Sequence, residues 1–514
     1  MINRCLSLLS RPYFKGGLRM EEKSIIIIGA GIAGLSAGCY GQMNGYRTQI
    51  FEMHDLPGGL CTSWNRKGYT IDGCIGWLMG SGPNFNYYKV WQELGALQGK
   101  HIIDHEEFLR IVDNEGKALI IYSDLDKLER HLKELAPEDA GEISKLIQLA
   151  RICSTFNPPI KKAPELMGLV DLIAFLFKAR PFLKINSRYR NITLQDYAKK
   201  FKSSFLRKMF PFLLVDVFSL IMMLGVLHKK SAGYPEGGSL EFSRGIERRY
   251  LNLGGTIHYR SPVVEIIVEN NRATGVKLLD GSIHRSDIII SAADGRTTIF
   301  DLLGGKYINS KIQDYYDNFP VFPPKILISL GVNRTFDGFP HWVIFLLDTP
   351  VVIGGQEQTS LGVEIYNFDH TLAPHGKTVL RILFDADYTY WYKLKQDPGR
   401  YKVEKEKIAE TVISLLDKRY PGLAALVEMF DVATPMTWVR YTGNWKGSYQ
   451  GWQLTEKTMP PFRMSKKFPG LESFYMVGQW VEPGGGLPPA ALSGRNVIQL
   501  ICKQDKKPFK TTLL

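Results

Sequence analysis

Residues 24–34 of the 514-residue chain read SIIIIGAGIAG, a run of isoleucines that leads directly into three spaced glycines. Consecutive β-branched residues predict a strand that is buried on both faces, as in a parallel sheet. The glycine-rich turn and the residues that continue through Leu35 to Tyr40 predict a helix after that strand. The stretch therefore predicts a strand–turn–helix unit of an α/β domain.

The glycines Gly29, Gly31 and Gly34 have the spacing G-x-G-x-x-G, in which each glycine has its own steric role. The first permits a tight turn, the second lets the backbone approach a pyrophosphate, and the third allows close packing of helix on strand. The helix N-terminus then presents free N–H groups and the positive end of its dipole to the phosphates. A second strand, 47–51, ends at Glu52, which we expect to accept hydrogen bonds from both hydroxyls of the adenosine ribose. This motif predicts cofactor binding by Gly29, Gly31, Ala33, Gly34 and Glu52.

Two further glycine-rich blocks suggest that the dinucleotide is FAD. Residues 57–63, PGGLCTS, follow the second strand, and Gly58 and Gly59 would admit the flavin-side phosphate or the ribityl chain. Residues 478–488, GQWVEPGGGLP, follow a predicted strand at 474–477 and precede a helix with proline in its first turn. The end of that helix could face the N1–C2 edge of a flavin, where negative charge accumulates on reduction. In this block the predicted cofactor contacts are Gly478, Gly485, Gly486 and Leu487.

The rest of the chain predicts two interleaved domains of different character. The text is helical from about 90 to 230, and residues 321–390 contain strand-like runs that fit an antiparallel sheet. The predicted fold class is α/β, a Rossmann-like FAD-binding domain with a parallel sheet interleaved with a mixed α+β substrate domain. The FAD-binding domain would comprise 20–90, 231–300 and 465–510. The substrate-binding, membrane-facing domain would comprise 91–230 and 301–464, and 1–19 would be a presequence or a non-native extension.

The composition of the chain restricts the kinds of partner that we expect it to bind. Lys and Arg outnumber Asp and Glu by 64 to 51, a net charge of +13, but the charges are spread out. Without a basic, aromatic-rich recognition segment, we expect no nucleic-acid partner. The six cysteines form no C-x-x-C pair, and the sequence has no metal-ligand pattern, so we expect no metal. Few cysteines in so long a chain fit a reducing compartment, and the predicted location is the cytoplasm.

One apolar segment, 209–227, could be mistaken for a membrane span. It contains Pro211 and Asp216 and is bracketed by basic residues, so it fits better as an internal helix or as one that dips into a bilayer surface. Basic residues also flank the apolar stretch 166–177, a pattern that suits docking on anionic lipid as well as ordinary solvated helix ends. Peripheral attachment to a membrane is therefore an expectation of the sequence.

The motifs resemble those of the phytoene desaturase family, which includes carotenoid isomerases and retinol saturase and lies within the amine-oxidase-like flavoproteins. The likeness rests on the glycine blocks above, on GYTIDG at 68–73 and on PEGG at 235–238, and it extends over about 20–505. It implies FAD as cofactor and places the backbone of Val263 against adenine. Two positions depart from the pattern, because Leu60 replaces a common arginine and Gln479 replaces a common acid.

The resemblance implies an FAD-dependent oxidoreductase that desaturates, saturates or isomerises a carbon–carbon bond in a hydrophobic polyene such as a carotenoid or retinoid. No second G-x-G-x-x-G unit follows a strand, so the electron donor or acceptor is left open. Glu482 and Asp72 are the candidate catalytic acid or base. Two alternatives stay open, an amine-oxidase-type flavoenzyme and a non-enzymatic prenyl-lipid carrier of the same fold.

Overall fold

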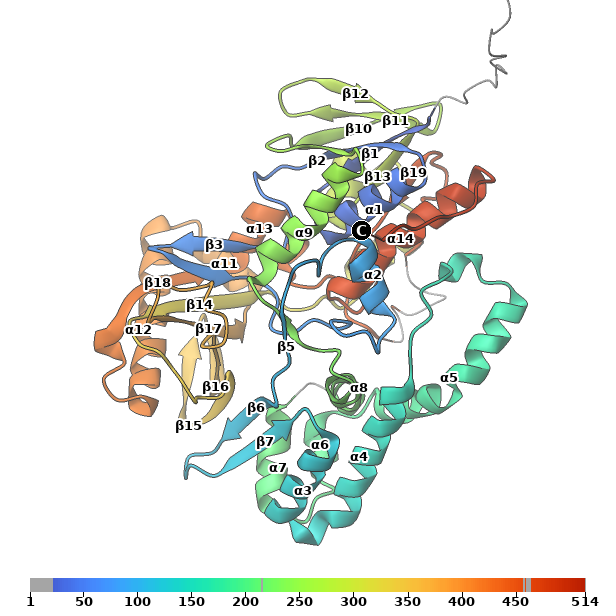
Figure 1. The fold of residues 1–514 in the computed structure, drawn as a ribbon. Helices are drawn as coiled ribbons and strands as arrows, with labels where there is room; N and C mark the ends of the chain where they lie inside the picture. Colours follow the sequence, from blue (N-terminus) through green and yellow to red (C-terminus); the bar gives the residue numbers. More distant parts are fainter. Residues whose placement is uncertain (1–21, 214–215, 456–457, 459–463, 514) are drawn as a thin grey trace, which may run out of the picture.

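A computed structural model describes residues 22–213, 216–455, 458 and 464–513. The predicted presequence or extension, 1–19, lies outside the described residues. Figure 1 shows a parallel sheet with helices on one side, a second and larger sheet, and a group of helices beside that larger sheet.

The first sheet is entirely parallel and has the strand order β19-β13-β1-β2-β9. Its central strand is the isoleucine run predicted from the sequence, paired with β2 on one side and β13 on the other. All five strands come from the segments that the sequence assigns to the FAD-binding domain. Their bounds are β1 (Ser24–Ile28), β2 (Arg47–Phe51), β9 (Thr256–His258), β13 (Ile288–Ser291) and β19 (Phe474–Met476).

The isoleucines of β1 alternate between two hydrophobic clusters because successive side chains of a strand point to opposite faces. Ile25 and Ile27 pack in a cluster with residues of three helices, whereas Ile26 and Ile28 pack in another with residues of a small antiparallel sheet. Both layers are visible in Figure 1. The helices are α1 (Ile32–Met43), α9 (Gly238–Asn252) and α14 (Leu487–Gln504), and the small sheet is β10 (Val263–Glu269), β11 (Arg272–Leu278) and β12 (Ile283–Arg285).

Glycines set the distance between α1 and its neighbours. A Cβ atom added to Gly34 would lie 2.0 Å from the carbonyl oxygen of Gly29, and one added to Gly494 in α14 would lie 2.4 Å from that of Ala33. The hydroxyl of Ser36 also donates a hydrogen bond to the carbonyl of Ala491, 2.6 Å away. The helices α1 and α14 are therefore in backbone contact, which fixes their N-termini relative to each other.

The second sheet has seven strands in the order β18-β14-β17-β16-β15-β6-β7 and packs against α11 and α12. The strands within 321–390 pair antiparallel, as the sequence predicts, and β6, which lies outside that range, joins β15 in parallel. The strand and helix bounds are β6 (Glu107–Val112), β7 (Ala118–Tyr122), β14 (Lys325–Val332), β15 (Trp342–Ile353), β16 (Gln356–Ile365), β17 (Thr378–Asp385), β18 (Val427–Ala433), α11 (Tyr388–Leu394) and α12 (Pro398–Arg419).

The expectation that residues 90–230 are helical is wrong for the strands β6 and β7. A tight turn joins them, in which the Asp113 carboxylate accepts hydrogen bonds from the N–H groups of Glu115 and Lys117. Short strands of this kind are stabilised by the sheet edge that they join, here β15, and not by their own propensity. Their long-range partner is the reason that local sequence did not reveal them.

The helical region has its own hydrophobic core. The predicted apolar segment, 209–227, contributes to that core chiefly through α8, most of which is buried. Among the described residues no single helix passes a length-and-composition test for a membrane span, and one pair, Ser204–Phe212 with Val217–His228, passes jointly but is bent by 83°. The helices are α3 (Leu125–Leu135), α4 (Ala140–Thr155), α5 (Leu169–Tyr189), α6 (Leu194–Ala198), α7 (Ser204–Met209) and α8 (Val217–His228).

Short elements connect the layers. A hairpin of β3 and β4 leads from the first sheet toward the second, and β4 contacts β17. The helix α13 packs beside α11 and precedes the segment that returns to the first sheet. The bounds are β3 (Ser63–Arg66), β4 (Tyr69–Asp72), α2 (Tyr87–Glu93), β5 (Ile102–Ile103), β8 (Tyr234–Pro235), α10 (Ser310–Asn318) and α13 (Pro435–Thr442).

Candidate functional site

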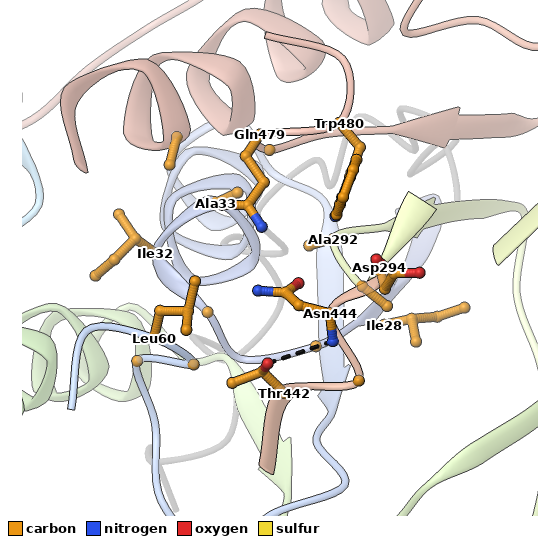
Figure 2. A pocket seen from close by; sticks show the side chains of 18 of the residues that line it. Ile28, Ile32, Ala33, Leu60, Ala292, Asp294, Thr442, Asn444, Gln479 and Trp480 are labelled. Atoms are coloured by element: carbon orange, nitrogen blue, oxygen red, sulfur yellow. Dashed lines mark hydrogen bonds between the residues drawn. The ribbon is translucent and has the colours of Figure 1, made fainter. Parts of the chain in front are cut away.

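A long cavity opens at the carboxyl ends of the first sheet, between the N-termini of α1 and α14. Ligands of open α/β sheets bind at this edge, because the loops that follow the strands converge there. Five loops line the cavity, one after each strand of the first sheet, and the loop after β2 contains the Pro-Gly-Gly block. Residues 441–444, 449 and 450, at and after the end of α13, complete the lining. Figure 2 shows the amide groups of Gln479 and Asn444 turned into the cavity from opposite sides.

Most of the residues predicted to bind a cofactor meet in this cavity. Two do not line it. Gly34 lies in the first turn of α1 and packs against the carbonyl of Gly29, and Gly485 packs against the side chain of Gln450. The predicted residues that line the cavity are Gly29, Gly31, Ala33, Glu52, Gly58, Gly59, Val263, Gly478, Gly486 and Leu487.

Glu52 is held at the cavity wall by backbone donors. Its carboxylate oxygens accept hydrogen bonds from the N–H of Ala30 at 2.7 Å and from the N–H of His54 at 2.8 Å. Burial raises the pKa of this carboxyl group, and the two N–H donors act in the opposite direction. Each oxygen has a second lone pair, so the side chain can also accept hydrogen bonds from a ligand's hydroxyl groups.

The two helix N-termini differ in what they offer to an anion. The first residues of α1 follow Gly31, which has no capping side chain, so their N–H groups are free to bind oxygen atoms. In α14, Pro488 and Pro489 carry no N–H, and the contribution of that end is chiefly its dipole. The α1 end therefore suits a phosphate, and the α14 end suits a weaker, delocalised negative charge.

Gly31 forms the part of the cavity wall where a ligand can come closest to the backbone. Its φ of −67° is accessible to any residue, so conformation does not require glycine there. An added Cβ would approach only the carbonyl oxygen of Gly58, at 4.0 Å, and would otherwise occupy the cavity. The space kept open by this glycine fits a group that lies against the chain, as a pyrophosphate does.

Asp294 is a cavity residue that the sequence analysis missed. Its carboxylate accepts hydrogen bonds at 2.8 Å from the N–H of Thr297, which begins the next helix, and from the N–H of Trp445. Burial raises the pKa of Asp294 to about 6. Its position three residues after β13 was a signal, because that is where the carboxyl edge of a parallel sheet places side chains.

The other missed residues come from the end of α13 and the segment after it. Tyr441, Thr442, Asn444, Tyr449 and Gln450 all line the cavity. The backbone N–H of Asn444 donates to the Thr442 hydroxyl at 3.3 Å, an interaction drawn in Figure 2. No local motif marks these residues, because they reach the cavity only through the packing of the two sheets.

The two candidate catalytic carboxylates lie outside the cavity lining. Glu482 forms an ion pair with Lys466, whose ammonium also lies 2.7 Å from Glu165. Asp72 accepts hydrogen bonds from the N–H groups of Ser239 and Cys74. These interactions give both carboxylates a structural role in holding loops and the start of α9.

Asp72 also belongs to a buried charge cluster. The Arg381 guanidinium lies 3.7 Å from an Asp72 carboxylate oxygen and donates to Glu364 at 2.6 Å. Burial raises the pKa of Asp72, while the Arg381 charge and the donors from Ser239 lower it. Among the described residues no group of three or more His, Cys, Asp or Glu side chains could hold a metal ion.

The fold and the cavity define a flavoprotein of the dinucleotide-binding class. The sequence matches the family of flavin containing amine oxidoreductases over residues 32–502, and the chain belongs to that family. It is 24% identical to a 4,4'-diapophytoene desaturase of Methylomonas sp, over 95% of this chain and 97% of the relative. It is 25% identical to a chloroplastic prolycopene isomerase of Daucus carota, over 93% of this chain and 79% of the relative.

A solved structure gives the same fold. An oxidoreductase from Methanosarcina mazei superposes with a TM-score of 0.58 at 17% identity, covering 93% of this chain and all of that one. The predicted fold class is confirmed, and so is the prediction of an FAD-dependent oxidoreductase. When bound, FAD supplies a two-electron acceptor or donor at its flavin ring.

The residues present fit this cofactor. We propose that Glu52 binds the adenosine ribose, that Gly31 and the α1 N-terminus bind the pyrophosphate, and that Gly486 and Leu487 face the flavin. Leu60 and Gln479, the two departures from the family pattern, both line the cavity and leave it without an arginine or an acid at those positions.

Replacing Gly31 with alanine tests the cavity assignment. We expect Gly31→Ala to leave the melting temperature of the apoprotein unchanged, because the backbone conformation tolerates a side chain and the Cβ meets no atom closer than 4.0 Å. FAD affinity should fall by about tenfold or more, since a displacement costing ~1.4 kcal/mol has that effect. Isothermal titration of apoprotein with FAD measures it. The matched control is Gly141→Ala in α4, where an added Cβ meets nothing within 4 Å. Equal affinity of both variants for FAD would contradict the assignment.

The raised pKa of Asp294 predicts that the free energy of unfolding depends on pH. Because its pKa is raised to about 6 by burial, the folded state keeps a proton that the unfolded state has released. The stabilisation that this proton gives to the folded state is complete at pH values below the pKa of Asp294 in the unfolded chain. It is lost as the pH rises through 6. Between pH 5 and 7.5 the wild type should lose about 1.4 kcal/mol of unfolding free energy relative to Asp294→Asn. Urea denaturation of both apoproteins at the two pH values measures this, and parallel pH profiles would show that Asp294 is not the group responsible.

Proposed function

We propose that the protein acts on a carbon–carbon bond of a hydrophobic polyene, such as a carotenoid or retinoid, by desaturation, saturation or isomerisation. The observation that carries this proposal is the match over more than nine tenths of the chain to proteins named as a diapophytoene desaturase and a prolycopene isomerase. Relatives that share the whole length share both the FAD domain and the part of the fold that would receive the substrate.

The lining of the cavity supports a hydrophobic ligand next to the cofactor. Among the described lining residues, Glu52 and Asp294 carry the only charged side chains, and both have backbone N–H partners. Most other lining side chains are small or apolar, among them Ile32, Leu60, Leu302, Trp480 and Leu487. A dry wall of this kind orients a polyene and excludes water, which is the contribution required from the protein when charge is delocalised along the substrate.

Two segments rich in apolar or aromatic side chains do not line this cavity. The aromatic run 388–392 belongs to α11, where Trp391 is buried against the second sheet. The apolar stretch 166–177 lies partly in α5 and is largely exposed. The substrate would therefore reach the flavin from the side of Cys74, Tyr449 and Gln450, which line the cavity between the two sheets.

The test is anaerobic spectroscopy of the purified holoenzyme with candidate polyenes. We expect a more saturated polyene to bleach the oxidised flavin bands if the enzyme is a desaturase, and a polyene to restore them after dithionite reduction if it is a saturase. An isomerase would convert the polyene without net change in flavin absorption. Absence of all three responses, with bleaching by a primary or secondary amine, would instead support the amine-oxidase alternative.

The non-enzymatic carrier makes a different prediction from either enzyme. A lipid carrier of this fold would purify colourless and would not take up FAD, while binding a prenylated lipid. The open wall at Gly31 and the buried, hydrogen-bonded Glu52 support cofactor binding instead. The flavin content of the purified protein distinguishes these possibilities before any substrate is added.

We further propose that α5 attaches the protein peripherally to a membrane from the cytoplasmic side. Figure 1 shows α5 projecting from the helical region, and large apolar side chains in its first half are exposed to solvent. Val170, Phe177 and Leu169 are 81%, 80% and 73% exposed, respectively. The exposed apolar residues are Leu169, Val170, Leu172, Ile173, Leu176 and Phe177.

Positive charge surrounds this apolar face. Lys178, Arg180, Lys184 and Arg188 follow on α5 and are exposed, and Lys161 and Lys162 precede it. Apolar residues that enter the acyl boundary, with basic residues at the headgroups, are the features by which interfacial helices bind anionic lipid. A polyene dissolved in that bilayer would then be available to the enzyme.

Flotation with vesicles tests this attachment. We expect the wild type to float with vesicles containing phosphatidylglycerol, and the double variant Ile173→Asp, Phe177→Asp to float about tenfold less, because both residues would lose apolar burial. Leu279→Asp is the matched control, since Leu279 is 70% exposed on a turn of the small sheet. Flotation of the double variant at the wild-type level would exclude α5 as the docking face.

A further inference from the structure

Two cysteines, Cys61 and Cys74, lie just beyond the open end of the β3–β4 hairpin. The strand register pairs Ser63 with Asp72, and the next step is joined by a hydrogen bond of 3.0 Å from the Gly73 N–H to the Thr62 carbonyl. Continued by one step beyond these contacts, the register would set Cys61 opposite Cys74. Directly opposed residues of an antiparallel pair have Cα atoms about 4.5–5.5 Å apart, within the range that a disulfide spans.

Both cysteines are free thiols. Burial raises the pKa of the Cys61 thiol, and the neighbouring Cys74 side chain acts in the same direction. Cys61 is buried, with its sulfur 3.5 Å from the carbonyl oxygen of Ser239, while Cys74 is half-buried. The two thiols are therefore neighbours, and one of them, Cys74, is partly exposed.

This pair lies in the wall of the FAD cavity. Among the described lining residues, the cysteines are Cys61 and Cys74. Only Leu60 separates Cys61 from the Pro-Gly-Gly block. The Tyr449 hydroxyl donates a hydrogen bond of 2.5 Å to the carbonyl of Gly73 and so fixes the loop between Asp72 and Cys74. By contrast, the buried thiols of Cys39, Cys153 and Cys502 do not line the cavity.

The position matters because no second G-x-G-x-x-G unit follows a predicted strand in the sequence, and the electron donor of the flavin is therefore open. A pair of thiols beside a flavin is chemically able to do so, since a dithiol and a disulfide differ by two electrons, as do the two forms of FAD.

We propose that Cys61 and Cys74 form a redox-active dithiol–disulfide pair that exchanges electrons with bound FAD. In the forward step each thiol loses its S–H bond, one S–S bond forms, and two electrons and two protons pass to oxidised FAD, giving FADH2. In the reverse step the disulfide would receive both from FADH2, its S–S bond would break, and two thiols would form. The proposal rests on FAD binding and not on the identity of the substrate.

The two cysteines have different tasks in this exchange. Burial raises the pKa of the Cys61 thiol well above its usual value, so Cys61 remains protonated at neutral pH when the pair is reduced. Cys74 is the accessible member, and a small external dithiol would attack its sulfur in the disulfide form. Reduction of the pair by that dithiol, followed by transfer to FAD, would supply electrons to the cofactor.

An anaerobic dithionite titration of the air-oxidised holoenzyme tests the proposal by counting electrons. The wild type should consume four electrons per FAD, two for the flavin and two for the disulfide, whereas Cys74→Ser should consume two. Cys153→Ser, which removes a buried thiol away from the cavity, should still consume four. Consumption of two electrons by the wild type would overturn the proposal.

A second readout requires no variant and no catalytic activity. In the oxidised wild-type holoenzyme the thiols of Cys61 and Cys74 should resist alkylation under denaturing conditions, and their peptides should appear joined with a loss of two hydrogen atoms by mass spectrometry. After dithiothreitol treatment both should alkylate. Alkylation of both residues without prior reduction would contradict the proposal even if the enzyme converts a polyene, and a joined pair would stand even if no polyene reacts.

Discussion

The backbone contact between α1 and α14 is the constraint on which the cofactor site depends. A Cβ added to Gly494 of α14 would strike the carbonyl oxygen of Ala33 in α1 at 2.4 Å, and one added to Gly34 would strike the carbonyl oxygen of Gly29, directly after β1, at 2.0 Å. Because these helices come from opposite ends of the sequence, their contact places the N-terminal motif and the C-terminal signature at one edge of the sheet. Two positive helix ends, one with free N–H groups and one without, then share a single cavity.

Buried polar contacts join the cofactor-binding sheet to the second sheet. Asp294 accepts from the Trp445 N–H, and Arg381 of β17 lies between Asp72 and Glu364. Removing one partner from a buried ion pair leaves an uncompensated charge, which costs several kcal/mol, on the order of 3–5. These contacts therefore hold the two parts of the chain in fixed positions beside the cavity. The contact with Arg381 also explains why the Asp72 carboxylate has a structural role.

The sequence predicted those parts of the site that are formed by residues close together in the chain. The G-x-G-x-x-G spacing and the strand that ends at Glu52 require only neighbouring residues, and ten of the twelve predicted cofactor residues line the cavity. Gly34 and Gly485 have packing roles beside it. Asn444 and Tyr449 were missed because their place in the wall depends on the docking of the second sheet, whereas Asp294, three residues after β13, had a local signal that was overlooked.

The same distinction between local and long-range determinants applies to the fold. The parallel sheet follows from an isoleucine run and its glycines, whereas β6 and β7 exist because β15 offers a parallel edge. The exposure of α5 was also beyond prediction, since its apolar periodicity is equally typical of a buried helix. The division into two discontinuous domains agrees with the membership of the two main sheets and remains a proposal.

The most direct test of the account is hydrogen–deuterium exchange of the apoprotein with and without FAD. If the helix ends share one dinucleotide, FAD should slow exchange of the backbone amides in residues 29–34 and 486–490 together. Exchange should also slow in residues 441–450, which belong to the second part of the fold. Residues 169–177 of α5 should be unchanged. Slower exchange at one helix end alone, with the other unaffected at saturating FAD, would contradict the central claim that α1 and α14 form a single cofactor site.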